Sequence, residues 1–426
     1  MAAVILSIGD ELVLGQTIDT NAAWLSERLA VLGVATRYHQ TLPDDRAVIA
    51  SALRRAADSE LVIVTGGIGP TEDDLTREAL ADAMDVGLES DLSSLERIEC
   101  FFRERGQPIP QRNAIQAQHP IGSTVIPNEC GTAPGIRATV GGATVYVTPG
   151  VPREMMAMFQ QSIEPQLRSN NPSAGTLLTC TVHSFGAGES AVAQQLSDLT
   201  DRNRNPTVGT TVGGGIVSIR IRSSFPDPRR ARDALEDTAH QVEQRLGPIV
   251  FGRNDQTLPD GVLQTLRNRG ETVATAESCT GGLVGKLLTD IPGSSAIYVG
   301  SWVTYSNQMK TQQLGVPASL IQEHGAVSEP VVREMAIAAR QRSGADRAIA
   351  VTGVAGPDGG TPQKPVGSVW VGLADARETH SLLLNLPGTR SSVRDRAAKC
   401  ALQLLRLQVL GESLDHITWV VPAHTP

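Results

Sequence analysis

Residues 60–76, ELVIVTGGIGPTEDDLT, join a short apolar run to a polar, acidic segment through a glycine-rich turn. A short apolar run bounded by turn residues is typical of a buried strand. The segment 73–84 that follows has the spacing of a helix, and acidic residues are favoured in a first helical turn by the helix dipole. We therefore predict strand, turn and helix in succession, with acids in the first turn of that helix.

The same alternation extends through the first third of the chain. Apolar runs predict strands at 3–9 and 142–148, and helical spacing predicts helices at 19–33, 44–58 and 152–163. Repeated strand-helix steps imply a parallel sheet covered on both faces. We expect a doubly wound α/β domain over residues 1–170.

Residues 168–175, RSNNPSAG, have the composition of a linker. The segments after it predict a β-α-β-α-β order and a small α+β domain over 174–254. Strands and helices then alternate again, from a helix at 254–270 to a long helix at 390–411. We expect a third domain, of α/β class, over 257–413.

Composition excludes several classes of protein. The 426 residues carry a formal charge of −8, which argues against a nucleic-acid scaffold because phosphate neutralisation needs a basic surface. The five cysteines form no CxxC pair, so neither a disulfide framework nor a zinc site is indicated and a reducing cytoplasm fits best. Residues 1–8 are apolar but lack a basic start and a cleavage site, and no apolar run approaches about 18 residues. We expect a soluble protein without a membrane partner.

The turn at 65–76 is a candidate phosphate site. The amides of Gly66, Gly67 and Gly69 can face an anion at the helix start. The turn is neither a P-loop, since no GK[ST] ends it, nor a GxGxxG fingerprint. Asp73 and Asp74 lie beside this site, and carboxylates next to a phosphate favour a bridging cation such as Mg²⁺.

Two further carboxylates are expected at the same edge of the sheet. Asp10 follows the first strand, and Glu154 follows the TPGVP segment at 148–152. Open α/β sheets bind ligands at the carboxyl ends of their strands. The alternative is that the acids at 72–74 only stabilise a helix start through its dipole.

Residues 275–282, TAESCTGG, place Ser278 and Cys279 against a glycine turn. The spacing does not match a P-loop, and Ala276 and Thr280 occupy the glycine positions of a nucleophile elbow. A serine nucleophile needs a base, and the nearby motif-like segments contain no histidine but offer Lys310 and Lys364. No activating partner for Cys279 is evident, so Ser278 is the better candidate. The alternative is a structural turn in which Ser278 or Thr280 caps the next helix.

Both constellations resemble one known family. The segments at 9–15 (GDELVLG), 65–76 (TGGIGPTEDDLT) and 148–155 (TPGVPREM) resemble the molybdopterin-binding-type domain of the CinA family. The segments AESCTGGL, IPGSS, VTYSNQMK, GAVS and TGVAGPDGGTPQKPVG, between Leu258 and Arg396, are similar to its C-terminal domain and to nicotinamide mononucleotide amidohydrolases of the PncC type. The chain departs from the family's pattern at Gly300-Ser301-Trp302, where a Gly-Gly pair is expected.

The resemblance implies two activities. For the N-terminal domain it implies a pyrophosphatase that splits ADP-ribose into AMP and ribose 5-phosphate with a divalent metal ion (Mg, Mn or Co). Its expected metal contacts are Asp73, Asp74, Asp10 and Glu154, and its expected phosphate contacts are Gly66, Gly67, Gly69 and Thr71.

For the C-terminal domain the resemblance implies deamidation of nicotinamide mononucleotide without a cofactor. Ser278 is then the nucleophile and Lys310 the base, with Ser295, Tyr305 and Thr352 around them and Gly281, Gly282 and Gly356 shaping the pocket. His324 and His380 are expected to be surface or core residues and not ligands. The family also implies a homodimer. A molybdopterin- or nucleotide-binding protein with a regulatory role is the alternative.

Overall fold

The computed structural model describes residues 1–106, 108, 111–170 and 176–421. Its contacts divide the chain into two compact units. The first comprises Met1–Leu178 with Ser224–Ala231, and the second comprises Thr179–Ser223 with Arg232–Pro426. Of the linker expected at 168–175, residues 171–175 lie outside the described residues.

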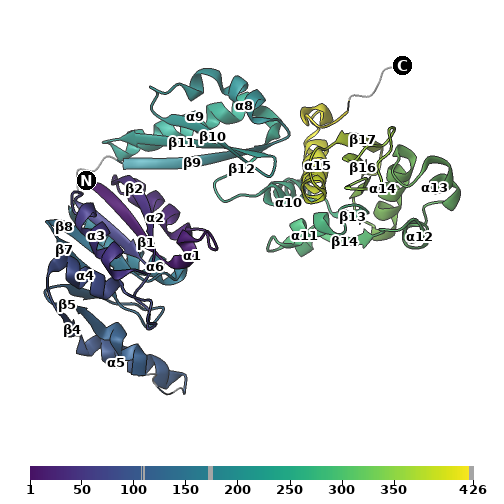
Figure 1. Ribbon diagram of the computed structural model, residues 1–426. Coiled ribbons are helices and arrows are strands. Elements are labelled where there is room, and N and C mark those ends of the chain that lie inside the picture. The colour runs from purple at the N-terminus through teal and green to yellow at the C-terminus, as the bar shows by residue number, and fades with distance from the viewer. Residues whose placement is uncertain (107, 109–110, 171–175, 422–426) are drawn as a thin grey trace. The chain divides into compact units, whose positions relative to one another are not determined.

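The N-terminal domain is built on a six-stranded sheet with the order β2-β1-β3-β8-β7-β6 (Figure 1). The strands are β1 (Ala2–Ile8), β2 (Ala35–Leu42), β3 (Leu61–Thr65), β6 (Thr124–Ile126), β7 (Gly135–Val140) and β8 (Ala143–Thr148). Strands β2, β1, β3 and β8 pair in parallel, which confirms the parallel sheet predicted from β1, β3 and β8, whereas β2 was not predicted. Strands β7 and β6 form an antiparallel edge. The reason is the two-residue turn Gly141-Gly142, whose positive φ angles suit a hairpin and leave no room for a crossover helix.

Helices cover both faces of this sheet, which confirms the doubly wound arrangement. On one face lie α2 (Thr20–Val31) and α6 (Pro152–Met158), packed against Ala3 and Ile5 of β1. On the other face lie α3 (Arg46–Ala56) and α4 (Thr76–Met84), packed against Val4 and Leu6. Successive side chains of a strand point to opposite faces, so the uninterrupted apolar run of β1 fills both cores.

The helix after the glycine turn begins later than the sequence predicts. Helix α4 starts at Thr76, so Asp73 and Asp74 precede it, and Glu78 is the acidic residue of its first turn. The carboxylate of Asp74 accepts a hydrogen bond from the backbone N–H of Thr71 at 2.8 Å, which closes a tight turn before the helix. The expectation of Asp73 and Asp74 in the first turn is therefore wrong.

The rest of the N-terminal domain consists of short elements and one longer helix. They are α1 (Asp10–Val13), β4 (Leu88–Ser90), α5 (Leu92–Glu104), β5 (Gln118–Pro120) and α7 (Glu164–Asn170), with a 3₁₀ helix at Gln111–Ala117 and a π-helical segment at Phe159–Ile163.

The middle domain has a four-stranded sheet with the order β10-β11-β9-β12. Its elements are β9 (Thr176–Phe185), α8 (Glu189–Leu196), β10 (Thr207–Gly213), β11 (Ile216–Phe225), α9 (Pro228–Leu246) and β12 (Val250–Arg253). In β11 the apolar residues are buried and Arg220 and Arg222 are exposed, which is the predicted alternation. Strand β10 was not predicted, because its Thr- and Gly-rich sequence lacks alternating apolar residues.

The C-terminal domain has a five-stranded mixed sheet with the order β14-β13-β15-β16-β17. The strands are β13 (Val273–Glu277), β14 (Tyr298–Val303), β15 (Arg347–Gly353), β16 (Ser368–Ala374) and β17 (Thr379–Asn385). Strand β13 pairs in parallel with both β14 and β15, which brings the carboxyl ends of these three strands to one edge.

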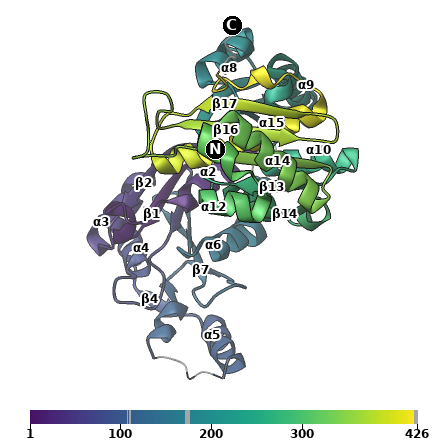
Figure 2. The same cartoon turned by 90° about the vertical axis from the view of Figure 1, so that its right-hand side faces the viewer.

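Helices again lie on both faces of the C-terminal sheet. The helices are α10 (Leu258–Arg269), α11 (Leu283–Thr289), α12 (Asn307–Met309), α13 (Ala318–His324), α14 (Glu329–Ser343) and α15 (Arg390–Leu410). Helix α14 packs on the face that carries Ala348 and Ala350 of β15 (Figure 2), whereas α10 and α15 pack on the face that carries Ile349 and Val351.

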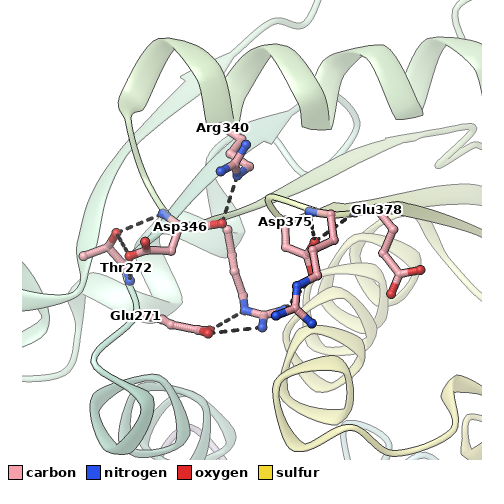
Figure 3. A network of polar contacts seen from close by, with 8 residues as sticks. Glu271, Thr272, Arg340, Asp346, Asp375 and Glu378 are labelled. Atoms are coloured by element: carbon pink, nitrogen blue, oxygen red, sulfur yellow. Dashed lines mark hydrogen bonds and ion pairs between the residues drawn. The ribbon is translucent and has the colours of Figure 1, made fainter.

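A polar network fixes the end of this sheet where β13 and β15 begin (Figure 3). The guanidinium of Arg347 binds the carboxylates of Glu271 and Asp375. The carboxylate of Asp346 accepts hydrogen bonds from the N–H and the hydroxyl of Thr272, at 2.8 and 2.7 Å. Ser278 follows the opposite end of β13, so this network lies at the other end of the strand from Ser278.

Within the described part of the chain, every helix is too short or too polar to cross a lipid bilayer.

Candidate functional site

The turn after β13 presents Ser278 at the carboxyl edge of the C-terminal sheet. Its N–H donates to the carbonyl oxygen of Val351 in β15 at 2.9 Å, so the sheet ladder continues up to the serine. The chain then reverses through Gly281 and Gly282, which have φ angles of 61° and 91°. Such angles suit glycine because it has no Cβ. The backbone conformation of this turn therefore requires glycine at both positions.

Neither Ser278 nor Thr280 caps the helix that follows, so the alternative of a purely structural cap is wrong. The N-cap of α11 is Gly282, which offers no side chain. The N–H groups of Val284 and Gly285, which have no acceptor within the helix, instead donate to the buried carboxylate of Glu277, at 3.1 and 2.8 Å. Glu277 thus satisfies the start of α11 and leaves the hydroxyl of Ser278 available.

Lys310 meets Ser278 inside the domain. Its Nζ lies 2.9 Å from the Oγ of Ser278 and 2.9 Å from the carbonyl oxygen of Thr304, with the carbonyl oxygen of Tyr305 at 3.4 Å. Lys310 is 1% exposed, and no carboxylate forms an ion pair with it among the described residues. Burial disfavours its charged form and lowers the pKa of Lys310 to about 8.

Of the remaining predicted residues, Thr352, Tyr305 and Gly356 are held by hydrogen bonds near the end of the sheet, whereas Ser295 is not. Thr352 continues β15 beyond Val351, and its hydroxyl donates to the carbonyl oxygen of Ala326 at 2.9 Å. Tyr305 and Gly356 are joined by Arg390, which donates to the phenol oxygen of the first and the carbonyl oxygen of the second, both at 2.8 Å. Ser295, in contrast, is exposed in a short 3₁₀ helix, and no polar contact in the described residues links it to Ser278.

Other residues weighed from the sequence lie away from Ser278 or are chemically unsuited. The Nζ of Lys364 donates to the carbonyl oxygen of His324 at 2.9 Å, so this lysine is engaged elsewhere. The side chains of His324 and His380 are partly exposed and pair with Glu323 and Glu378. Burial raises the pKa of Cys279 to about 12, which disfavours a reactive thiolate.

The departure from the family's pattern falls on the edge strand β14. Ser301 accepts a hydrogen bond from the hydroxyl of Thr275 at 2.9 Å, and Trp302 packs against the core beneath α14. Ser301 and Trp302 are larger than glycine, and they point to opposite faces of the strand. The hydrogen bond with Thr275 accommodates Ser301, and the core accommodates Trp302.

Sequence reasoning missed three residues of this site: Glu277, Arg390 and Arg394. Arg394 donates to the carbonyl oxygens of Cys279 and Thr280, at 3.1 and 2.8 Å. Both arginines belong to α15, more than a hundred positions after Ser278, and nothing in the local sequence indicates that this helix returns to the turn. Only Glu277 carried a signal, because a charged residue at the end of a buried strand needs a partner.

Hydrogen bonds donated to its carbonyl oxygens hold the N-terminal glycine turn in place. Thr76 donates from its hydroxyl to Gly66 O at 3.0 Å and from its N–H to Gly67 O at 2.9 Å. Arg77, which is 2% exposed, donates to the carbonyl oxygens of Ile68 and Gly69. Among the described residues, no acceptor binds the N–H groups of Gly67, Ile68 or Gly69. This arrangement leaves three N–H groups free for an anion.

The predicted carboxylates at this edge are only partly brought together. Asp10 and Asp44 exchange hydrogen bonds from backbone N–H to carboxylate, at 2.9 and 3.2 Å. Burial raises the pKa of Asp44, and the negative charges of Asp10, Glu11 and Asp73 add to this rise. Asp44 was not predicted.

Asp74 and Glu154 are engaged elsewhere. Asp74 binds the N–H and the hydroxyl of Thr71, and Glu154 accepts a hydrogen bond from the amide of Asn128 at 2.7 Å. In the described ranges, no three His, Cys, Asp or Glu side chains converge in a geometry that holds a metal ion. A cation at this edge would therefore need ligands from a bound phosphate as well.

Comparison with known proteins assigns the chain to a family. Residues 4–169 match the family described as "Probable molybdopterin binding domain", 179–252 match "Damage-inducible protein CinA KH domain", and 255–409 match "CinA C-terminal domain". A CinA-like protein of Synechococcus sp. (strain CC9902) is 43% identical over 414 residues, covering 96% of this chain and 98% of the relative. A CinA-like protein of Gemmatimonas aurantiaca is 42% identical over 415 residues, covering 96% and 97%.

A solved structure of CinA from Thermoplasma acidophilum, described as of unknown function, is 34% identical, covers 39% of this chain and 97% of its own, and has a TM-score of 0.37. The full-length relatives and the three matched domains agree with the resemblance of the motifs. The chain belongs to the CinA family and combines a molybdopterin-binding-like domain, a small KH-like domain and a CinA C-terminal domain.

Proposed function

We propose that the C-terminal domain is an amidohydrolase that converts nicotinamide mononucleotide to the acid and ammonia. The observation that carries the proposal is the hydrogen bond between Lys310 and Ser278, at 2.9 Å, with the lysine buried and its pKa lowered to about 8. A general base works best when its pKa is close to the operating pH. The nucleotide substrate comes from the similarity to PncC-type enzymes.

The hydrogen bonds of Lys310 fit the proposed role of a base. In the structure Nζ donates to three oxygens, Ser278 Oγ and the carbonyl oxygens of Thr304 and Tyr305. In the proposed reaction Lys310 is a neutral amine with two N–H donors, which stay on the two carbonyl oxygens, and one lone pair, which then accepts from the hydroxyl of Ser278. Ser278 then attacks the amide carbon while Lys310 takes its proton. As the C–N bond breaks, Lys310 gives this proton to the leaving nitrogen and ammonia departs. Water hydrolyses the resulting ester and regenerates Ser278.

Arg390 supports a nucleotide substrate at this site. It links Tyr305 to Gly356 near the edge where Ser278 lies, and it is an exposed cation that a phosphate can reach. The test is ammonia release from nicotinamide mononucleotide by the purified protein at pH 8.5 without added cofactor. Absence of ammonia release there, or undiminished release by the Ser278→Ala variant, contradicts the proposal.

We further propose that the N-terminal domain hydrolyses the pyrophosphate of ADP-ribose with a divalent metal ion such as Mg, Mn or Co. The free N–H groups of Gly67, Ile68 and Gly69 support an anion site. Asp10 and Asp73 would hold the metal together with phosphate oxygens, which suits Mg²⁺ because it is usually bound by one or two carboxylates plus substrate phosphates. The metal would neutralise the phosphate charge. The test is release of AMP from ADP-ribose with and without divalent cations.

A binding role is the second candidate for the N-terminal domain. It is favoured by the absence, within the described ranges, of a preformed three-carboxylate metal site. In that case the free N–H groups bind the phosphate of a molybdopterin or nucleotide without turnover. Co-purified pterin and no AMP release would favour this role.

The proposal includes a homodimer in a reducing cytoplasm and no nucleic-acid partner. The thiols support a reducing setting, since all five cysteines are free. Light scattering of the purified protein measures the oligomeric state.

A further inference from the structure

The turn that carries Ser278 contains two buried N–H groups without an acceptor. The N–H groups of Cys279 and Thr280 donate to no atom of the described chain, although these residues are 6% and 0% exposed. The hydroxyl of Thr280 is also buried and without a partner. Orphaned buried donors are rare because each costs free energy comparable to a lost hydrogen bond. Thr280 is fully buried, so a ligand cannot reach its donors, whereas Cys279 is 6% exposed and directly follows Ser278. The unpaired N–H of Cys279 therefore points to a ligand atom that accepts from it.

The carbonyl groups of the same turn are all occupied. Ser278 O accepts from the N–H of Gly281 at 3.0 Å. Cys279 O and Thr280 O accept from the Nε and Nη2 of Arg394, at 3.1 and 2.8 Å. The guanidinium therefore fixes two successive peptide groups, the second of which carries the N–H of Gly281. Because that N–H donates to Ser278 O, and Ser278 O shares its peptide group with the N–H of Cys279, Arg394 holds the N–H of Cys279 through the turn.

The N-terminal glycine turn is built in the same way. There the guanidinium of Arg77 binds two successive carbonyls, of Ile68 and Gly69, and the neighbouring N–H groups stay free. The local sequences around the two arginines differ, and each arginine comes from a helix that packs beside its turn. Both turns thus leave N–H donors available where an anion is proposed.

We propose that the N–H of Cys279 stabilises the oxyanion that forms when Ser278 attacks an amide carbonyl, and that Arg394 is the positioning residue that holds this N–H in place through the turn. This inference rests on the proposed amidohydrolase function. The N–H of Gly281 is not a donor to the oxyanion, because Ser278 O already accepts it. Preorganised donors of this kind are usually the largest single contribution to acyl-transfer catalysis.

The experiment compares Arg394→Ala with Arg396→Ala. Arg396 is a matched control because it lies on the same helix and also donates to a loop carbonyl, that of Pro387, at 2.8 Å. The substrates are nicotinamide mononucleotide and its thioamide analogue, in which sulfur replaces the carbonyl oxygen. A second measurement, independent of the substrate, is the rate at which a fluorophosphonate labels Ser278, followed by mass spectrometry.

For Arg394→Ala we expect kcat to fall about 100-fold with KM within about threefold, because the lost interaction acts in the transition state. We also expect the ratio of kcat for the oxygen and sulfur substrates to fall at least about fivefold, since sulfur accepts hydrogen bonds weakly and gains little from an intact oxyanion site. Labelling of Ser278 should slow by a factor similar to kcat. Guanidinium ions should restore part of the activity, and Arg396→Ala should match the wild type.

Equal kcat in the two variants would overturn the inference, and so would a fall in kcat with an unchanged oxygen-to-sulfur ratio. If Arg394→Ala does not fold, Arg394→Lys replaces it, and its ratio must lie below that of the wild type. If the wild-type protein labels at Ser278 but releases no ammonia, the proposed substrate is wrong, and the labelling rates alone decide the role of Arg394. If the wild-type protein is not labelled at Ser278 and also releases no ammonia, both proposals are contradicted.

Discussion

The Nζ of Lys310 lies 2.9 Å from the Oγ of Ser278, although 32 positions separate the two residues in the chain. Strand β13 ends at the serine, and the lysine follows the helix α12 after β14. Because β14 pairs with β13 in parallel, the chain leaves both strands at the same edge of the sheet. The parallel pairing therefore brings Ser278 and Lys310 together.

Replacing Ser278 by alanine removes the proposed nucleophile. We expect ammonia release from nicotinamide mononucleotide to fall by a factor on the order of 10⁴ or more. Hydrolysis of ADP-ribose should be unchanged, because its proposed groups belong to the other compact unit. Parallel assays of both activities on one preparation check this, and a simultaneous loss of both would indicate misfolding.

The deamidase activity should depend on pH through Lys310. Only the neutral amine accepts the proton of Ser278, and burial lowers the pKa of Lys310 to about 8. We expect kcat to rise with pH and to level off above about 8. Lys310→Met should be inactive across the range. Lys364→Met should keep the wild-type profile, since its Nζ binds the carbonyl oxygen of His324.

Burial of Lys310 should also make stability depend on pH. Its pKa is lower in the folded protein than the value of 10.5 for an unperturbed lysine, so the unfolded chain binds more protons between about pH 8 and 10.5. The wild type should therefore gain stability relative to Lys310→Met as pH rises through this window, by on the order of 3 kcal/mol in total. Urea unfolding of both proteins at pH 7, 8.5 and 9.5 measures the difference, which must change in this direction.

Removal of the acidic groups at the N-terminal turn should abolish ADP-ribose hydrolysis. Asp73→Ala loses a proposed metal contact, and Asp74→Ala loses the hydrogen bonds that hold Thr71 in the turn. We expect at least about a 100-fold loss of AMP release in each variant and in the wild type treated with a chelator. Added Mg, Mn or Co should restore AMP release in the chelator-treated wild type but not in the two variants. Turnover that persists in excess chelator would contradict the metal requirement, whereas deamidation should be unaffected throughout.

Arg347 should contribute to the stability of the C-terminal domain. Its side chain is 12% exposed and binds both Glu271 and Asp375. Arg347→Met leaves the carboxylate of Glu271 without a partner, whereas Asp375 keeps its hydrogen bonds from the N–H groups of Arg377 and Glu378. We therefore expect a loss of about 3 kcal/mol in the free energy of unfolding. Lys286→Ala breaks a solvent-exposed ion pair with Asp290 and should cost less than about 0.5 kcal/mol. Equal effects of the two changes would contradict the structural role given to Arg347.

Much of the fold follows from local patterns. The apolar run of β1, the helical spacing of α2 and α3, and the glycine turns after β3 and β13 predicted the α/β class and the order of elements. Strands β2, β10 and β17 were among those missed, because pairing with β1, β11 and β16, and not a pattern in their own sequence, makes them strands. The beginning of α4 was misplaced because the contact of Asp74 with Thr71 competes with helix formation.

The sequence by itself determined that this protein has two glycine turns at the carboxyl ends of strands, one beside acids and one beside Ser278. It offered both Lys310 and Lys364 as a base and did not indicate how either turn is held. The tertiary structure places Lys310 on Ser278, and it brings Arg77 and Arg394 to the carbonyls of the two turns. The physical reason is that strand pairing and helix packing bring these partners together from distant parts of the chain. The local sequence around each residue follows its own helix or strand and does not indicate the distant partner.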